Sequence, residues 1–286
     1  MRRRLRVRRG TGARVERLGA QLSGRALVAG ALAVGALAAA AVSCAPGRAV
    51  RASRATLEVP GLAAVETTNG RNASMVYALR TSAGVVVVDL GWRGAQGALT
   101  RALARLGATP GDVAGVLLTH SHRDHVGAWR LVAHAPFYLG AAEVPRLFGE
   151  RPHGGWIPRV ADELRAPALP ARGAVRVVAL AHDTALVFGR DTIRAFLMPG
   201  HTAGSVAYLA RGVLFVGDAA SATVGSNRLR PARRGYSDDA AEARRSLARL
   251  RLAAATYDVR VLCTAHARCA AATPSGWTTL APDAGP

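Results

Sequence analysis

The stretch "LLTHSHRDHVGAW", residues 117–129, ends an apolar run and decides how the chain is interpreted. It places His120, His122, Asp124 and His125 within six positions, although the whole chain has only 8 histidines. The apolar run before it is typical of a buried strand. Side chains two positions apart on an extended segment point the same way, and the last two residues follow where the backbone turns. Imidazoles and a carboxylate at this spacing predict a site for divalent metal ions.

Three later apolar runs also end in a residue that can bind a metal, and glycine precedes the first two of these residues. The three residues are His201 in "LMPGHTAGSVAYL" (197–209), Asp218 in "VLFVGDAAS" (213–221) and His266 in "VRVLCTAHA" (259–267). Taken singly, each of them is ambiguous between a ligand and an ordinary polar residue. A repeated order of strand followed by ligand predicts that the side chains converge at one edge of the sheets.

The rest of the body alternates short apolar runs with Gly, Pro and Asn, as expected of strands joined by turns. Strands are predicted at 55–59, 73–79, 84–90, 113–119, 136–140, 174–180, 184–188, 191–198, 205–210, 213–217 and 258–264, and helices at 94–108, 127–134, 141–150 and 239–254. Residues 151–173 are rich in Pro and Gly and are predicted to form a long loop. Two strand-rich halves that each close with helices favour two stacked sheets covered by helices.

The charge of the chain is concentrated at its N-terminus. The formal net charge is +20, with 38 basic residues that are all arginine. Residues 1–54 hold twelve arginines and one acid, so the remaining body is only moderately basic. Because aromatic residues make up only 5% of the chain and the basic excess precedes an apolar segment, nucleic acid is not the expected partner.

Residues 1–47 predict export or membrane attachment. Arginines precede an uncharged run, "ALVAGALAVGALAAAAVSCAPG" (26–47), which is long enough for a helix to cross a bilayer. The arginines would keep that end cytoplasmic and place the body outside. Three interpretations fit this pattern: a cleaved signal peptide, a lipoprotein signal with Cys44 as the lipidated residue, and an uncleaved anchor. Residues 48–54 are then a linker, and residues 276–286 a C-terminal tail.

Two further cysteines, Cys263 and Cys269, lie near the end of the chain. Outside the cytoplasm they could form a disulfide, but two small buried thiols fit the spacing equally well. Neither belongs to a CxxC pair, so a zinc site built from thiolates is not expected.

Together these motifs resemble those of the metallo-β-lactamase superfamily, over residues 55–275. The resemblance implies an α/β fold of four layers, the αββα sandwich, in which helices cover two stacked sheets. It also implies the ligands of two metal ions: His120, His122 and His201 for the first, Asp124, His125 and His266 for the second, and Asp218 as a bridge between them. Asp89 in "VVVVDLG" is similar to the family's carboxylate that supports the ligand loops from behind.

The resemblance implies a hydrolase that holds two zinc ions per chain, with iron or manganese as alternatives. A metal-bridging hydroxide would attack a small ester, thioester or lactone while Asp124 and Asp218 orient it and transfer its proton. Asp218 disfavours a β-lactamase, because the best-known zinc β-lactamases lack a bridging aspartate. Ser221 stands where the lactonases have a tyrosine, and the last histidine lies in "AHA" instead of the usual "GHG".

Other chemistries use similar motifs. Persulfide dioxygenases of this superfamily hold one iron through the equivalents of His120, His201 and Asp218. A phosphodiesterase or nuclease, a β-lactamase and a binding protein without catalysis are weaker alternatives. Substrate contacts are sought in the loops that carry His153, Trp156 and Tyr236, although surface or packing roles are the simpler expectation for these three.

Overall fold

The computed structural model describes residues 59–272, apart from 71, 165 and 223–228. The predictions for residues 1–47, 48–54 and 276–286, including Cys44, lie outside this part of the chain, as does nearly all of the strand predicted at 55–59. Within the described residues, the helices are all too short or too polar to span a bilayer.

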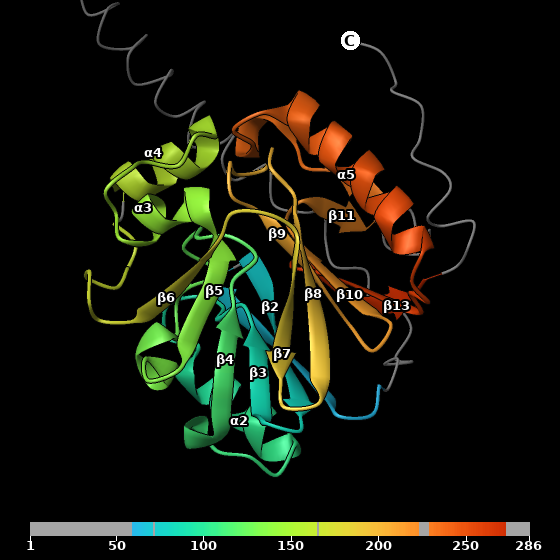
Figure 1. Cartoon of the computed structure of the whole chain (residues 1–286). Coiled ribbons are helices and arrows are strands. Elements are labelled where there is room, and N and C mark those ends of the chain that lie inside the picture. The colour runs from blue at the N-terminus through green and yellow to red at the C-terminus, as the bar shows by residue number, and fades with distance from the viewer. Residues whose placement is uncertain (1–58, 71, 165, 223–228, 273–286) are drawn as a thin grey trace, which may run out of the picture. The chain divides into compact units, whose positions relative to one another are not determined.

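Two six-stranded sheets form the centre of the fold (Figure 1). The first sheet contains, in spatial order, β1 (Leu62–Asn69), β2 (Asn72–Thr81), β3 (Gly84–Val88), β4 (Val113–Leu117), β5 (Pro136–Gly140) and β6 (Arg176–Leu180). The second sheet contains β14 (Ala267–Ala271), β13 (Val261–Thr264), β10 (Val213–Gly217), β9 (Val206–Ala210), β8 (Asp191–Leu197) and β7 (Thr184–Phe188). A third, small sheet pairs β11 (Ala220–Ala222) with β12 (Leu229–Pro231).

Strand direction explains where the predicted ligands gather. Strands β3 to β6 run parallel, and so do β10 and β13. The carboxyl ends of parallel neighbours lie at the same edge of a sheet. Residues that follow β3, β4, β10 and β13 therefore reach one end of the molecule, and these are the stretches that carry most of the predicted ligands.

The period of β3 shows how the layers are built. Val85 and Val87 pack in the core outside the first sheet, whereas Val86 and Val88 pack between the two sheets. This alternation is expected of a strand that is buried on both faces. A third core lies on the outer face of the second sheet, where Leu247 contributes from α5.

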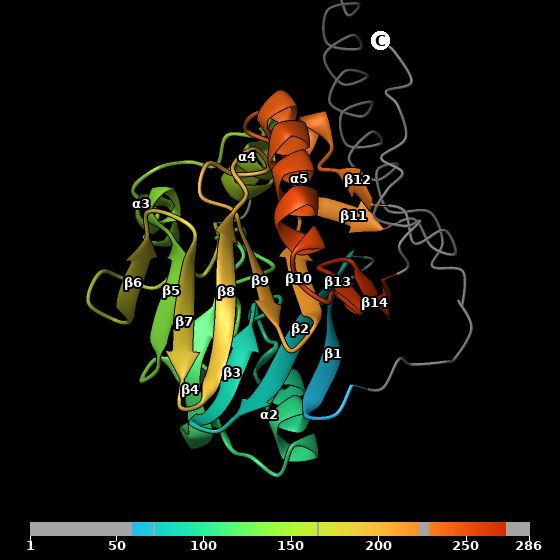
Figure 2. The same ribbon diagram turned by 45° about the vertical axis from the view of Figure 1, so that its right-hand side comes forward.

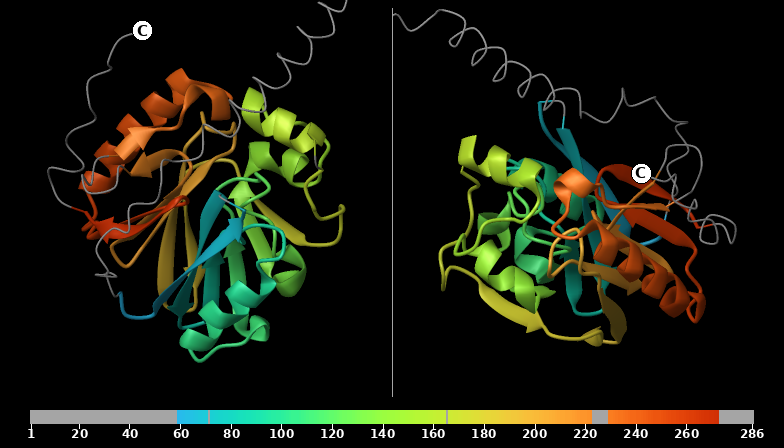
Figure 3. Two further views of the ribbon diagram at one scale, coloured as in Figure 1. Left: turned by 180° about the vertical axis from the view of Figure 1, so that it is seen from behind. Right: turned by 90° about the horizontal axis from the view of Figure 1, so that it is seen from above.

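Helices cover both outer faces, as Figures 2 and 3 show. The helical elements are α2 (Gln96–Arg105), α3 (Val144–Leu147), α4 (Trp156–Leu164), α5 (Ala240–Ala255) and the 3₁₀ turns η1 (Pro110–Asp112), η2 (Trp129–Val132), η3 (Ala141–Glu143) and η4 (Arg234–Tyr236). Side chains of α2 join the core outside the first sheet, and those of α5 join the core outside the second. The predicted αββα sandwich is therefore confirmed.

Several local predictions were wrong. The segment 62–69, "LAAVETTN", forms β1 although no strand was predicted there. The long loop predicted at 151–173 contains the helix α4, and the helix predicted at 127–134 is only the short turn η2. Strands β11, β12 and β14 were not predicted either; each has three to five residues and depends on a partner strand.

Candidate metal centre

All seven predicted ligands lie together, in two groups of side chains that could each hold a metal ion. His120, His122, His201 and Asp218 form the first group, and Asp124, His125 and His266 form the second. Four of the seven come from the loop after β4, one from the loop after β8, one from the end of β10 and one from the turn between β13 and β14. The convergence that the sequence predicted is present in the fold.

The first group, called here the triple-histidine group, brings three ring nitrogens to one point. Nε2 of His120 lies 2.9 Å from Nδ1 of His122, and Nε2 of His201 lies 3.2 Å and 3.1 Å from these two atoms. Nitrogens bound to one tetrahedral zinc at about 2.0–2.1 Å lie about 3.3 Å apart. The observed spacing is close to that value, and all three side chains are almost fully buried.

The second group meets the first at Asp218. The Oδ2 atom of Asp218 lies 3.6 Å from Nε2 of His201 and 4.0 Å from Nε2 of His120. The same oxygen lies 3.8 Å from Nε2 of His125 and 3.0 Å from Nε2 of His266. One carboxylate oxygen is therefore within 4.0 Å of ring nitrogens from both groups, so two bound ions could share it.

Asp124 completes the second group. Its Oδ2 atom lies 3.5 Å from Nε2 of His125 and 3.7 Å from Nε2 of His266. His266 is the most accessible of the predicted ligands, with 42% of its side chain exposed. Within the second group, His266 is therefore the ligand on the solvent side, whereas His125 and Asp124 are buried.

Asp89 holds the ligand loop from behind, as expected from its place after β3. Its carboxylate accepts hydrogen bonds from the backbone N–H and the hydroxyl of Thr119 and from Nδ1–H of His125, each at 2.8 Å. The bond from His125 leaves the lone pair of Nε2 facing Asp124 and Asp218. Asp89 has φ 57°, a left-handed conformation that aspartate tolerates better than most residues.

The neighbouring ligands are oriented by similar contacts. Because the Thr119 hydroxyl donates to Asp89, its oxygen can accept the Nδ1–H of His120 at 3.1 Å. Nδ1–H of His266 donates to the backbone carbonyl of Ala73 at 2.6 Å. When these two rings are neutral, Nε2 is the nitrogen without a proton, and it faces the other ligands.

Burial and charge separate the two groups electrostatically. Burial lowers the pKa of His120 and His122 well below the usual value, and it also lowers the pKa of His201. Burial has the same tendency at His125 and His266, but nearby carboxylates outweigh it, Asp89 foremost at His125 and Asp218 at His266. Their pKa values rise to about 9 and about 10.

The buried atoms of the site fit a bound cation. Nε2 of His125 and Oδ1 of Asp218 are buried and have no hydrogen-bond partner among the described residues. A polar atom that is buried without a partner is costly unless a ligand, ion or water satisfies it. Three neutral rings with nitrogens about 3 Å apart likewise favour a cation shared between them.

A buried polar network behind the ligand loop was not predicted from the sequence. The carboxylate of Glu143, which is fully buried, accepts hydrogen bonds from the backbone N–H of Ser121 at 2.9 Å and of Gly204 at 3.2 Å, and from the Ser121 hydroxyl. It therefore ties the loop that carries His120 and His122 to the loop that carries His201. A glutamate in a predicted helix gave no signal of this role.

The three residues expected near a substrate have different positions. His153 is buried, its ring centroid lies 4.4 Å from that of His122, and its Nδ1–H donates to Asp162 of α4. Trp156 begins α4 and is 57% exposed, and Tyr236 is half-buried in η4. His153 therefore has the packing role that was the simpler expectation.

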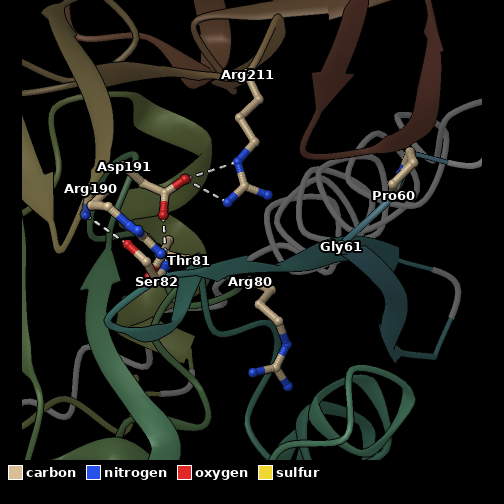
Figure 4. Close-up of a pocket in the computed structure, with 8 residues that line it drawn as sticks. All are labelled: Pro60, Gly61, Arg80, Thr81, Ser82, Arg190, Asp191 and Arg211. Atoms are coloured by element: carbon tan, nitrogen blue, oxygen red, sulfur yellow. Dashed lines mark hydrogen bonds and ion pairs between the residues drawn. The ribbon is translucent and has the colours of Figure 1, made fainter.

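A separate hollow of about 540 Å³ lies at the opposite end of the sheets, near the turns β2–β3, β7–β8 and β9–β10 (Figure 4). Asp191 accepts hydrogen bonds there from Arg211 and from the backbone N–H of Ser82, while Arg80 points away from this pair. Asp191 and Arg211 are thus paired with each other, and none of the seven predicted ligands lines the hollow.

Comparison with known proteins agrees with the fold and the ligand motifs. Residues 69–266 match the metallo-beta-lactamase superfamily. The chain belongs to this family. A metallo-beta-lactamase family protein from Thermus thermophilus has the same fold, with a TM-score of 0.57 and 24% identity over 77% of each chain.

Two curated relatives are enzymes by name. A probable polyketide biosynthesis zinc-dependent hydrolase of Bacillus velezensis is 27% identical over 51% of this chain and 54% of its own length. A hydroxyacylglutathione hydrolase of Acidiphilium cryptum is 34% identical over 42% of this chain and 38% of its own length. The chain thus spans about half, or less, of the length of these relatives.

Proposed function

We propose that the protein is a zinc-dependent hydrolase that holds two zinc ions and acts on a small ester, thioester or lactone. The observation that carries this proposal is the position of Asp218, whose Oδ2 atom lies within 4.0 Å of ring nitrogens from both ligand groups. Family membership and the names of the two curated relatives support the same class of reaction.

The proposed division of labour follows from the two groups. His120, His122 and His201 would hold the first zinc, and Asp124, His125 and His266 the second, with Asp218 shared. Zinc bound there would lower the pKa of water to about 7 and polarise a carbonyl group.

The chain's own carboxylates do the remaining work. Nearby histidines, with His266 first, outweigh burial and lower the pKa of Asp218, so this side chain stays an acceptor at neutral pH. Asp218 and Asp124 can then accept hydrogen bonds from a water molecule and orient it between the two groups. In the neutral ring of His125, Asp89 accepts the proton of Nδ1, so that Nε2, on the side of the site, is the nitrogen that can bind a metal ion.

An acyl substrate is favoured over a phosphodiester for two reasons. The relative from Acidiphilium cryptum is named for hydrolysis of an acylated thiol, hydroxyacylglutathione. Residues 1–54 contribute more than half of the formal net charge of +20, so the part of the chain that carries the ligands is only moderately basic. Export of the body, with the site outside the cytoplasm, stays a prediction from residues 1–47.

The test is metal analysis of the purified full-length chain, followed by assays with thioesters, lactones, β-lactams and phosphodiesters. We expect two zinc ions per chain and hydrolysis of an ester, thioester or lactone. Removal of a ligand in His120→Ala should lower the rate by about 100-fold or more. His134→Ala is the matched control, because His134 is exposed and outside both groups.

Other results would contradict the proposal. One iron per chain together with oxygen uptake would indicate the persulfide-dioxygenase chemistry. Cleavage of phosphodiesters alone would indicate a nuclease, and equal losses in His120→Ala and His134→Ala would show that the triple-histidine group is not the site.

A further inference from the structure

The two C-terminal cysteines form a disulfide that encloses a predicted ligand. Cys263 and Cys269 are bonded to each other and lie three residues before and three residues after His266. His266 lies in the short turn between β13 and β14, and it is the most exposed residue of the two ligand groups. The pairing that the sequence left open is therefore present, and it closes a small covalent ring around this histidine.

Strand β14 is held by few contacts besides the disulfide. It lies at the edge of its sheet and pairs there with β13, one hydrogen bond from Tyr77 of β2 reaches its first residue, Ala267, and none of its side chains is fully buried. The pairing shifts between Leu262 and Thr264, so that two residues of β14, Arg268 and Cys269, lie opposite Cys263. A bulge of this kind interrupts the hydrogen bonds between the strands. The disulfide crosses at this interruption.

The other end of the disulfide is firmly anchored. Cys263 is fully buried in the core between the two sheets, and Cys269 packs against the same core. The disulfide thus ties the returning edge strand to a fixed point.

Strand β2 holds the turn from the other side. The hydroxyl of Tyr77 donates to the carbonyls of Thr264 and Ala267, at 2.7 Å and 3.2 Å, and the N–H of Met75 donates to the carbonyl of Ala265 at 2.7 Å. Hydrogen bonds from β2 thus fix the position of the turn. The return along β14 beyond Ala267 depends on a few strand pairs, one bond from the N–H of Ala272 to the carbonyl of Arg260, and the disulfide.

We propose that the Cys263–Cys269 disulfide is a positioning element for the second metal ion, holding His266 in the geometry in which its Nε2 faces Asp218 and Asp124. The inference rests on the proposed function, because it assigns His266 to a zinc ion. Loss of an interaction that orients a ligand typically costs 10-fold to 100-fold in metal affinity. The triple-histidine group has no contact with this hairpin other than through Asp218, so its affinity should not depend on the disulfide.

The experiment compares the full-length chain with the double variant Cys263→Ser/Cys269→Ser by competition with a zinc-binding dye. We expect the affinity for the second zinc to fall by about 10-fold to 100-fold and that for the first to change by less than about threefold. The control is Ile193→Ala, a cavity in the same core on β8, which lowers stability without touching the hairpin. Ile193→Ala should leave the affinity for the second zinc unchanged.

Equal affinity for the second zinc in the double variant and the parent would overturn the inference. So would an equal loss at both sites, or the same loss in Ile193→Ala, since these results would show a general effect of stability.

If the double variant does not fold, reduction of the folded parent replaces it. One phosphine and one water reduce the disulfide to two thiols and leave the phosphine oxide, and a gain of two thiols per chain verifies the reaction. The affinity for the second zinc should then fall by the same factor as expected for the double variant, and an unchanged affinity would overturn the inference.

A separate readout does not depend on zinc. Hydrogen exchange of the metal-free chain reports on the amide of Ala265, which donates to the carbonyl of Gly217 at 3.2 Å. We expect this amide to exchange at least about tenfold faster without the disulfide, because the turn opens locally. Unchanged exchange would overturn the inference. If the parent chain bound fewer than two zinc ions, but the amide of Ala265 still exchanged faster after loss of the disulfide, only the proposed function would be contradicted.

Discussion

Gly217 offers a sharp test of how closely the ligand loops are packed. This glycine precedes Asp218 and has φ 54°, and a Cβ added there would lie 2.4 Å from Oγ1 and 2.5 Å from Cβ of Thr119. Gly217→Ala therefore has two costs. The left-handed backbone costs an alanine about 1–2 kcal/mol, and the overlap with a side chain that is fixed by hydrogen bonds costs about 1–3 kcal/mol more.

The matched control is Gly107→Ala. Gly107 has φ 62°, and a Cβ there would meet no atom within 4 Å, so only the backbone cost applies. For a domain of this size about 1 kcal/mol lowers the melting temperature by about 2–4 °C. We expect the melting temperature of the metal-free chain to fall by about 5–15 °C in Gly217→Ala and by about 3–6 °C in Gly107→Ala.

The same substitution should also affect zinc binding. Displacement of Thr119 weakens its two hydrogen bonds to Asp89, and Asp89 in turn orients His125. The second zinc should therefore bind about tenfold more weakly in Gly217→Ala and unchanged in Gly107→Ala. Thermal unfolding and zinc titration of both variants are the assays. Equal destabilisation in the two variants would refute the packing that the structure describes around Gly217.

Three further predictions use the charges of the site. His125 and His266 have raised pKa values, about 9 and about 10, so both are protonated in the metal-free chain at neutral pH and zinc must displace both protons. Below pH 8 the affinity for the second zinc should therefore fall by about 100-fold per pH unit, and the affinity for the first should fall less steeply. Competition with a zinc-binding dye measures both affinities, and the same dependence on pH at the two sites would contradict this prediction. Glu143→Gln places an amide N–H against a donor such as Ser121 and should lower the free energy of unfolding by about 1–3 kcal/mol, measured in urea. The control Glu150→Gln should change it much less, because Glu150 is exposed. Removal of zinc by a chelator should lower the free energy of unfolding. The loss should be about 2.7 kcal/mol relative to a chain at a free zinc concentration 100-fold above the dissociation constant. An unchanged melting temperature would contradict a zinc site that exists only in the folded chain.

The convergence of the ligands was predictable from the sequence because the same pattern, an apolar strand followed by a polar residue, occurs several times. Each of His201, Asp218 and His266 follows an apolar run, and the carboxyl ends of such strands meet at the same place. Asp89 was identified from the resemblance of "VVVVDLG" to the family's motif. The layers were predictable because the strand-rich halves each end in helices.

What was missed depends on contacts between distant parts of the chain. Glu143 reaches Ser121 and Gly204, which are 22 and 61 residues away, and nothing in its own neighbourhood indicates this. Strand β1, "LAAVETTN", is apolar only in its first half, and it forms because it pairs along its whole length with β2. The cysteine pair could not be decided from spacing, because only the hairpin of β13 and β14 brings Cys263 and Cys269 together.

The central claim is that seven side chains hold two cations around one shared carboxylate. Anomalous diffraction at the zinc edge from crystals of the zinc-loaded chain tests it directly. We predict two peaks about 3.5–4 Å apart, one beside His120, His122 and His201, the other beside Asp124, His125 and His266, with Asp218 reaching both. A single peak, or a second peak away from His266 and Asp218, would contradict the account.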